Sequence, residues 1–539
     1  MTHQGISSSE SEHIKESERS RVVKAAGVVG LGTLLSRIFG FLRDMVVAAF
    51  FGAGFATDAF FVAFRIPNLL RSILAEGSLT IAFVPVFTEY LKRHSKKSAF
   101  ELANVAMTLL SIILACVSVA GVLLAPWIVK LIAFGFGDDP AKYQLTVFLT
   151  RLMFPYIFFM SLVALCMGIL NSLRHFATPA LSPVLLNIAI IAAALFLRDC
   201  FREPVVALAV GVLIGGVLQL VVQFPALSRM GVRLRPDFHF THPGVARISL
   251  LMLPALFGAA VYQINLFVGT LLASFLPSGS VSYLYYADRI VQLPLGVFAL
   301  AVGTASLPSF SDQAARGDYG ELKRTISFSL RIILFVTIPC MVAFIALRIP
   351  IISVLFQHGR FDASATIRTA DALLFYTLGL WAFSGIRVVV SAFYALQDTK
   401  TPVKVAFLAF IVNVIASLIL MGPLQHGGLA LAVSIASSVN ITVLVLILRK
   451  KIGPFFEDDF LRAAARGIVA SLIMGAAIIA VLFFMEWCVA GDLMGRIFTL
   501  IIAVVVGGTV FVTASFMLGG SEMRVVVDLV KRKLGKKAG

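Results

Sequence analysis

The sequence predicts an all-α polytopic membrane protein with about fourteen transmembrane helices, built as two parallel six-helix repeats around a central cavity plus two extra C-terminal helices. Three observations predict this fold class. The composition is too apolar for a soluble chain, apolar runs of membrane-spanning length recur along it, and one half of the sequence resembles the other.

Composition alone excludes several classes of protein. Of 539 residues, 59% are hydrophobic and 14% are charged, and the mean hydropathy is +0.96. Soluble domains are about 45–50% apolar and about 25% charged. The excess apolar surface must therefore face lipid, which excludes a cytosolic enzyme, a secreted disulfide scaffold and a disordered regulator. The five cysteines are widely spaced without a CxxC motif, so they indicate neither a zinc site nor a disulfide framework.

Membrane helices are predicted wherever an apolar run reaches the length of about 20 residues that crosses a bilayer. The runs lie between glycine, proline and charged residues, at 24–51, 56–90, 99–133, 142–172, 179–199, 204–227, 246–275, 281–312, 321–352, 366–396, 402–421, 427–449, 461–486 and 495–518. Residues 1–21 lack the apolar segment of a signal peptide and are expected to form a disordered cytoplasmic tail. Residues 521–539 are expected to form a basic amphipathic cytoplasmic tail at the membrane surface.

The charge distribution predicts the orientation. Lys and Arg number 45 against 28 acidic residues, a formal net charge of +17. In a membrane chain such a surplus is typical of cytoplasmic loops, so it does not indicate a nucleic-acid partner. Basic residues gather in alternate connections, such as 92–97, 229–235 and 449–451, whereas the opposite connections hold few cations, among them Lys142 and Arg360 beside acids. Both termini are therefore predicted to be cytoplasmic.

An internal repeat recurs at one fixed spacing, the separation of Pro179 from Pro402, which we call the repeat offset. ALAV at 207–210 returns at 430–433 with this offset, and so does AFVPVF at 82–87 as ASLPSF at 305–310. The repeat unit predicts an N-lobe over 22–230 and a C-lobe over 231–452, with the extra helices 13 and 14 in 453–520. A duplicated bundle around a central cavity favours an alternating-access transporter, and the alternative is a large structural scaffold.

Charged residues inside three predicted helices mark a candidate site. They are Arg37, Arg43, Asp44, Asp58, Arg65, Arg71, Glu76, Asp288 and Arg289. A charge at the bilayer centre costs at least about 2.5–3.5 kcal/mol, so these side chains are expected to face a wet or protein-lined interior. At 100° per residue, Asp58, Arg65 and Glu76 share one face of the helix predicted at 56–90.

The excess of arginine among these residues favours a phosphate- or pyrophosphate-bearing substrate, because the planar guanidinium binds phosphate oxygens in pairs. The alternative is that the acids simply neutralise the arginines in structural salt bridges. The sequence contains no phosphate-binding loop, no HExxH and no catalytic triad, so we expect neither enzymatic activity nor a cofactor.

Several stretches resemble a known family. SRIFGFLRD, GAGFATDAFFVAFRIPNLLRSILAEGS, GSVSYLYYADRIVQLPLGVF, LFQHGRFD and ALQDTKTPVK are similar to the MurJ (MviN) lipid II flippases of the multidrug/oligosaccharidyl-lipid/polysaccharide exporter superfamily. The resemblance implies a multi-pass protein of the bacterial inner membrane. It would move undecaprenyl-pyrophosphate-linked disaccharide-pentapeptide from the cytoplasmic to the periplasmic leaflet for peptidoglycan synthesis. A flippase for another polyprenyl-linked glycan and a non-transporting scaffold of cell-wall synthesis are the alternatives.

The resemblance also implies roles for individual residues. The positions that would bind the pyrophosphate and head group are Arg37, Arg43, Asp44, Arg65, Arg71 and Arg289. Those that would act in gating and in coupling the lobes are Asp58, Glu76 and Asp288. The two extra helices would form a groove for the lipid tail. The implied partners are lipid II, membrane lipids and cell-wall synthesis proteins.

The resemblance is weakest at a cation site. Some family members bind sodium through acids on helices 7 and 11, where this sequence has Gly269, Asn413 and Ser417. A hard cation needs oxygen ligands, and carboxylates supply most of the affinity. The acid-depleted positions disfavour sodium binding, so no metal site is assigned. Membrane potential, protons and sodium stay open as the source of coupling energy.

Overall fold

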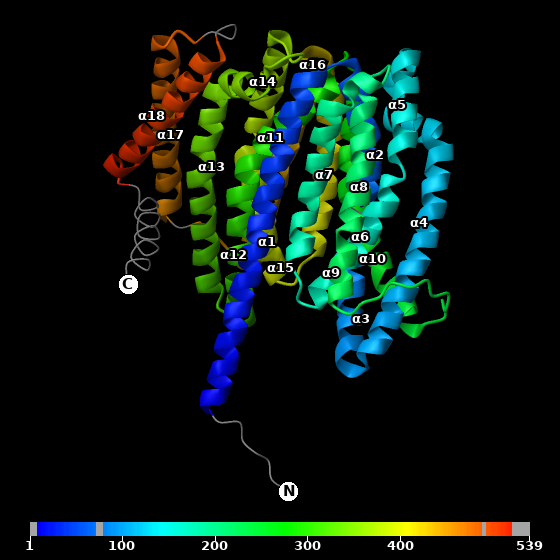
Figure 1. Ribbon diagram of the computed structural model, residues 1–539. Coiled ribbons are helices and arrows are strands. Elements are labelled where there is room, and N and C mark those ends of the chain that lie inside the picture. Colours follow the sequence, from blue (N-terminus) through cyan, green and yellow to red (C-terminus); the bar gives the residue numbers. More distant parts are fainter. Residues whose placement is uncertain (1–7, 72–78, 457, 488–491, 520–539) are drawn as a thin grey trace. The chain divides into compact units, whose positions relative to one another are not determined.

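The computed structural model describes residues 8–71, 79–456, 458–487 and 492–519, and every regular element in these ranges is a helix (Figure 1). The fold class predicted from the sequence is thereby confirmed. The predicted tail at 521–539 lies outside the described residues.

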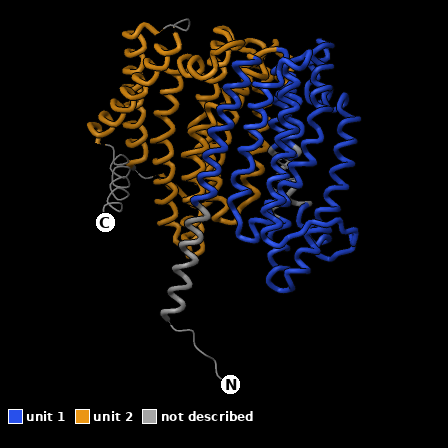
Figure 2. Tube along the Cα trace, viewed as in Figure 1, with its two compact units in different colours: residues 1–51, 55–271 blue, residues 52–54, 272–539 orange. Residues whose placement is uncertain are grey.

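The chain divides into two compact units (Figure 2). Unit 1 comprises residues 1–51 and 55–271, and unit 2 comprises residues 52–54 and 272–539. The division falls near the end of helix α10 (Pro243–Ser274), after the lobe boundary at 230/231 that we expect from the repeat. The predicted lobe boundaries therefore stay predictions.

Unit 1 holds most of the first ten helices. Besides α10, they are α1 (Ser8–Phe51), α2 (Phe55–Arg71), α3 (Leu79–Arg93), α4 (Lys96–Ile132), α5 (Pro140–Met153), α6 (Tyr156–Ser172), α7 (Ala177–Phe196), α8 (Val206–Val221) and α9 (Gln223–Arg229). The short turns η2 (Phe134–Asp138) and η3 (Arg198–Cys200) precede α5 and α8. One apolar core of this unit joins α3, α4 and α6 around Phe83, Phe87 and Leu102.

Unit 2 holds the remaining helices. They are α11 (Ser280–Pro294), the π-helical segment η4 (Leu295–Ala299), α12 (Leu300–Ala315), α13 (Tyr319–Phe356), α14 (Ala363–Thr377), α15 (Leu380–Ala395), α16 (Lys400–Ile452), α17 (Asp458–Phe484) and α18 (Leu493–Met517). One apolar core of this unit contains Phe310, Ile333 and Phe393, and a smaller one joins α17 and α18 to α13 around Leu347 and Ile478.

The helix α16 is long enough to cross a membrane twice. Its 53 residues would extend about 80 Å if straight, far beyond the thickness of a bilayer. The backbone breaks at Gln425, whose φ of 48° and ψ of −130° are non-helical. Ten helical stretches of the described chain are long and apolar enough to span a membrane. With the second half of α16 and the more polar α1, α2–α3 and α10, these give about 14 crossings, as predicted.

Several predicted boundaries were wrong, since the runs at 142–172, 204–227 and 366–396 are each two helices and those at 402–421 and 427–449 are joined in α16. Of the helix predicted at 56–90, the structure describes α2, which reaches Arg71, and α3, which begins at Leu79, and residues 72–78 lie outside the description. Asp58 and Glu76 therefore do not lie on one described helix. The tail predicted to be disordered over 1–21 is helical from Ser8 onward, because it is rich in Glu, Lys and Arg, which favour helices.

The internal repeat extends to the helix caps. Asp139 caps α5 by accepting from the amides of Ala141 and Lys142, and Asp362 caps α14 by accepting from the amide of Ala365. The two aspartates are separated by the repeat offset found in the sequence. The starts of α4 and α13, and of α7 and α16, are displaced by the same offset.

The repeat even preserves an unusual backbone conformation. Arg174, between α6 and α7, has a φ of 61°, and Gln397, one repeat offset later, has a φ of 57°. Only a few residues other than glycine adopt this left-handed region. In both copies the next amide donates back to a carbonyl of the preceding helix, at 2.8 Å from His175 to Leu170 and at 2.9 Å from Asp398 to Phe393. The same turn therefore ends the equivalent helix in each copy.

Close helix contact positions α1 in unit 1. A Cβ atom added at Gly32 would lie 2.7 Å from both the Cβ and the carbonyl oxygen of Ala180 in α7. Since no side chain fits there, glycine at position 32 lets α1 and α7 approach. Gly32 of α1 thus has a packing role.

Candidate functional site

Arg43 is held at the contact of α1 and α7. Its Nε and Nη2 donate to Asp44 Oδ1 at 3.0 and 2.7 Å, and its Nη1 donates to Asn187 Oδ1 at 3.1 Å. The side chains of Arg43 and Asp44 are only 11% and 4% exposed. Asn187 in turn donates to the carbonyls of Ser36 and Pro183, each at 3.3 Å. The guanidinium is therefore fixed by a carboxylate and by an amide that the backbone orients.

A second charged pair joins α2 to α5. Asp58 Oδ2 lies 2.9 Å from Lys142 Nζ, with side-chain exposures of 1% and 6%. The ammonium also lies 4.3 Å from the centre of the Phe136 ring. The prediction that Lys142 belongs to an outer connection was wrong, because it lies in the first turn of α5 and is buried. Asp58 thus has a lysine partner that the sequence pattern does not reveal.

The other cations of α2 have polar contacts. Arg65 donates from Nη1 to the hydroxyl of Thr270 in α10, and that hydroxyl donates to the Leu266 carbonyl at 2.8 Å. Arg71 donates from Nε to Asn68 Oδ1 at 3.0 Å, one turn earlier on the same helix. Each of these two guanidiniums therefore donates a hydrogen bond to an uncharged side-chain oxygen.

The remaining predicted residues of unit 1 differ in accessibility. Arg37 lies on α1 before the Arg43 cluster, and its side chain is exposed. Glu76 lies outside the described residues. The structure thus brings Arg43 to Asp44 directly, while the neighbours of Asp58 and Arg65 lie on different helices, α5 and α10.

The predicted residues of unit 2 lie together on α11. Arg289 Nη2 donates to the Tyr285 hydroxyl at 2.9 Å, and the guanidinium carbon lies 4.8 Å from the centre of that ring. Asp288 accepts from the amide of Gln292. Both charged side chains are partly exposed. A guanidinium supported by a phenol keeps its positive charge and can still bind an anion.

The candidate cation positions are buried in α16. Asn413 and Ser417 are 5% and 3% exposed and lie one turn apart on one helix. Amide and hydroxyl oxygens are weak ligands for a hard cation in the absence of carboxylates. The expectation that no metal site can be assigned here stays a prediction.

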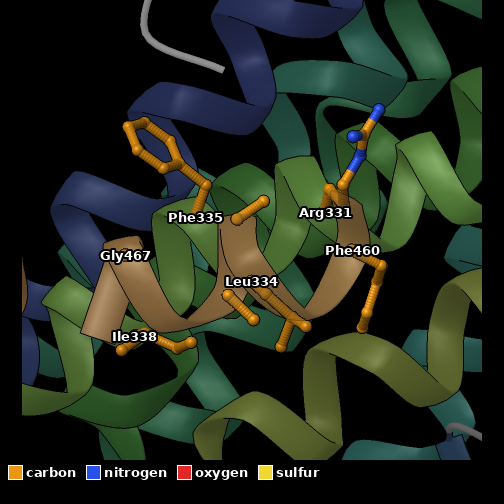
Figure 3. A pocket seen from close by; sticks show the side chains of 8 residues that line it. Arg331, Leu334, Phe335, Ile338, Phe460 and Gly467 are labelled. Atoms are coloured by element: carbon orange, nitrogen blue, oxygen red, sulfur yellow. The ribbon is translucent and has the colours of Figure 1, made fainter. Parts of the chain in front are cut away.

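A narrow crevice separates α13 from α17 (Figure 3). Its volume is about 10 Å³, and it is lined by Leu334, Phe335 and Ile338 of α13, and by Phe460 and Gly467 of α17 among others. The Arg331 guanidinium points away from the apolar side chains at its margin (Figure 3). This volume suits about one water molecule, so the crevice in this structure is too narrow for an acyl or prenyl chain.

The candidate site has more cations than acids. Among the described site residues of unit 1, the arginines at 37, 43, 65 and 71 and Lys142 exceed the acids Asp44 and Asp58. The sequence pattern did not identify Lys142, Asn187 or Thr270 as partners of these groups. Asn187 had a signal, since a lone amide in the middle of an apolar helix is costly without hydrogen bonds. An excess of cations favours an anionic ligand, and the set has no nucleophile–base pair within the described ranges.

Comparison with known families gives one match over most of the chain. Residues 47–499 match the family described as "Lipid II flippase MurJ". A "Probable lipid II flippase MurJ" of Buchnera aphidicola subsp. Schizaphis graminum (strain Sg) is 36% identical over 499 residues, 92% of this chain and 97% of its own. A "Lipid II flippase MurJ" of Burkholderia cenocepacia is 38% identical over 460 residues, 85% of this chain and 88% of its own.

Solved structures show the same relationship. A structure described as "Lipid II flippase MurJ, inward closed conformation" has a TM-score of 0.76 at 28% identity, covering 91% of this chain and 98% of that one. An inward-facing multidrug resistance transporter of the MATE family, in the MOP superfamily, has a TM-score of 0.66 at 16% identity, covering 78% of this chain and 95% of that one. The second likeness concerns the fold alone.

Proposed function

Because this chain belongs to the MurJ family of lipid II flippases, we propose that it moves lipid II from the cytoplasmic to the periplasmic leaflet of a bacterial inner membrane by alternating access. The family is one of transporters, not of enzymes. The distribution of basic residues supports cytoplasmic positions for both termini. Lipid II is a peptidoglycan precursor, so the protein would serve cell-wall growth.

The observation that carries the proposal is the buried, oriented guanidinium of Arg43. Asp44 and Asn187 hold it through three hydrogen bonds, and only 11% of the side chain is exposed. Fixing an arginine in this way removes the entropic cost of ordering it when an anion arrives. A pyrophosphate presents several oxygens to such a fork, and its interaction is stronger away from bulk water.

The other arginines would share the head group. Arg289, supported by the Tyr285 hydroxyl, would contact the head group during transport, and so would Arg37, Arg65 and Arg71. The acids Asp58 and Asp288 would act in gating. Asp44 neutralises the charge of Arg43 while no substrate is bound and so reduces repulsion among the arginines. A pyrophosphate would then compete with this carboxylate for the guanidinium.

The lipid tail would stay in the bilayer. α17 and α18 carry large exposed apolar side chains, including Leu461, Phe483, Phe484, Met494 and Met517, which suit contact with lipid. A polyprenyl chain would lie along these helices while the charged head crosses through the protein. The source of coupling energy is proposed to be membrane potential, protons or sodium.

The test measures lipid II in each leaflet of cells that depend on this protein. We expect Arg43→Ala to leave lipid II in the inner leaflet and to fail to support growth at normal expression. Arg93→Ala, at a cation whose side chain is 76% exposed, is the matched control and should behave as wild type. Arrival of lipid II at the outer leaflet after inhibition of the protein would refute the function. Normal transport by Arg43→Ala would refute the assigned site.

A further inference from the structure

A pocket in unit 2 lies where α14 passes the break in α16. Its volume is about 790 Å³, within the range of about 300–1,000 Å³ that is typical of small-ligand sites. One wall is the outer face of α14 with Ile367, Arg368 and Asp371, and the other is the break itself from Pro423 to Gly427. This pocket shares no residue with the proposed lipid II site.

Arg368 and Asp371 give the pocket two separate charges of opposite sign. They lie three residues apart on α14, so their side chains project from neighbouring positions of one face. Both are exposed, and neither forms an ion pair or a side-chain hydrogen bond within the described part of the chain. The pocket therefore presents one guanidinium and one carboxylate side by side to a ligand.

The walls of the pocket are fixed rather than loose. His426 is 5% exposed, and its Nε2 lies 2.8 Å from the Arg368 carbonyl oxygen. A carbonyl only accepts, so Nε2 carries the hydrogen and ties the break to α14. Further along α16, Ser434 Oγ donates to the Phe375 carbonyl at 2.6 Å. A Cβ atom added at Gly427 would lie 2.7 Å from the Phe375 ring, so the two elements are in close contact.

The break carries backbone strain. Gln425 has a φ of 48° with a ψ of −130°, outside the regions that residues with a side chain normally adopt. Strain of this kind costs about 1–3 kcal/mol and is often found next to binding sites. The backbone conformation of Gln425 keeps the far wall turned toward α14.

The duplicated scaffold does not require these charges. The positions one repeat offset before Arg368 and Asp371 are Leu145 and Phe148 of α5, which are uncharged. Both helices start with the same aspartate cap, so the two copies share backbone but differ here in chemistry. The pair is a property of this pocket, not of the fold.

The location indicates the kind of ligand. The predicted topology makes the break in α16 the turn between two membrane crossings, which would place the pocket at the level of the lipid head groups. Ile367 and Leu424 on its rim are 47% and 36% exposed and offer apolar surface next to the charges. We infer that the pocket binds the zwitterionic head group of phosphatidylethanolamine, with the phosphate on Arg368, the ammonium on Asp371 and the acyl chains on the apolar rim.

Charge complementarity distinguishes this lipid from the others. Phosphatidylglycerol has the phosphate but no cation for Asp371. Phosphatidylcholine has a quaternary ammonium without N–H donors, so it forms no hydrogen bond to the carboxylate. A primary ammonium donates such bonds, which are stronger when one partner is charged. The site therefore selects phosphatidylethanolamine among phospholipids that share the same backbone.

The experiment titrates the purified full-length protein in mild detergent with dioleoyl phosphatidylethanolamine, phosphatidylcholine or phosphatidylglycerol and counts bound lipid by native mass spectrometry. Wild type should bind phosphatidylethanolamine about two- to fivefold more tightly than the other two, as expected for one partly exposed charge pair. Asp371→Asn should abolish this preference, and Arg368→Gln should weaken binding of all three lipids. Asp312→Asn, at an exposed acid of α12 outside the pocket, should change nothing.

Equal affinities for the three lipids, or an unchanged preference in Asp371→Asn, would overturn the inference. Tighter binding of phosphatidylglycerol would reassign the pocket to simple anions. Displacement of the lipid by the zwitterionic dipeptide alanyl-alanine would reassign it to peptides. The readout needs no transport, so its result is independent of whether the protein flips lipid II.

Discussion

Lys142 Nζ lies 2.9 Å from Asp58 Oδ2, and less than a tenth of either side chain is exposed. The pair connects the first turn of α5 to the first turn of α2 inside unit 1. Removing two charges from water costs several kcal/mol for each ion, which the attraction between them offsets only when both are present. Asp58 therefore stabilises the fold of this unit in addition to any part it has in gating.

Breaking this pair from one side should destabilise the protein strongly. We expect Lys142→Met to reduce the free energy of unfolding by about 3–5 kcal/mol, because it leaves a buried carboxylate without its ammonium. Thermal unfolding of the detergent-solubilised protein measures the effect. The double variant Asp58→Leu with Lys142→Met should recover much of the loss, since no buried charge remains. An unchanged midpoint in Lys142→Met would show that the pair has no structural role.

Asn187 should position Arg43 rather than contact substrate by itself. Replacing Asn187 with Leu removes the acceptor of Arg43 Nη1, and the loss of a hydrogen bond to a charged group, about 1.5 kcal/mol, corresponds to roughly a tenfold drop in transport. Reconstituted vesicles with a leaflet-specific readout measure this rate. Asn187→Asp keeps an acceptor for Arg43 but loses the donor to the Ser36 and Pro183 carbonyls, so it should restore part of the activity. Equal defects in the two variants would contradict a positioning role.

Gly32 should be required for packing. In Gly32→Val the added side chain collides with the Ala180 backbone and Cβ, and overpacking of this kind costs about 1–3 kcal/mol. The midpoint of thermal unfolding should fall accordingly. Gly30→Val is the matched control on the same helix, because nothing lies within 4 Å of a Cβ atom added there. Similar midpoints for the two variants would mean that α1 does not need this contact.

Asp398 should contribute to stability in a pH-dependent way. Lys451 Nζ at 2.9 Å, the Thr401 amide and the Thr401 hydroxyl together lower the pKa of Asp398 from its ordinary value of 3.8 to about 2. A carboxyl group with a lowered pKa stabilises the fold above its ordinary pKa, and this stabilisation is lost as the pH falls through 2. Asp398→Asn should therefore lower the unfolding midpoint at pH 7, by the equivalent of up to about 1 kcal/mol for a partly exposed pair.

The same variant provides the pH control. The difference in midpoint between Asp398→Asn and wild type should narrow between about pH 4 and pH 2, because protonation then removes the charge from wild type as well. A difference that stays constant over this range would show that the carboxylate charge is not what stabilises the turn.

The helices could be predicted from the sequence where they depend on a local pattern of apolar residues. A membrane helix needs an apolar run. Each run bounded by glycine, proline or charged residues forms a helix or a pair of helices, as α5 and α6 within 142–172 show. The repeat was also predictable, since proline and small residues keep their spacing when a chain is duplicated. The break that divides the run predicted at 142–172 into α5 and α6 was not, because the apolar pattern continues across it.

The site was predictable in its residues and less so in its contacts. Charges inside apolar helices mark Arg43, Asp58 and Arg289 because they are costly there. Lys142 escaped notice because Asp138 and Asp139 beside it are typical of a solvated loop, and its partner Asp58 is 84 residues away. Helical spacing relates residues on one helix, whereas Asp58 and Arg65 are held by partners on others, which only tertiary packing determines.

The left-handed turns at Arg174 and Gln397 have a consequence for how the two copies can diverge. Because arginine and glutamine both occupy this backbone shape, the duplication has conserved geometry without conserving the side chain. Paired saturation mutagenesis, aligned at the repeat offset, should find the same intolerance at the two aspartate caps and different tolerance at Leu145 and Arg368. Each copy would thus have evolved its own ligand preferences on an inherited frame, so that the substrate path and an accessory lipid site can change independently.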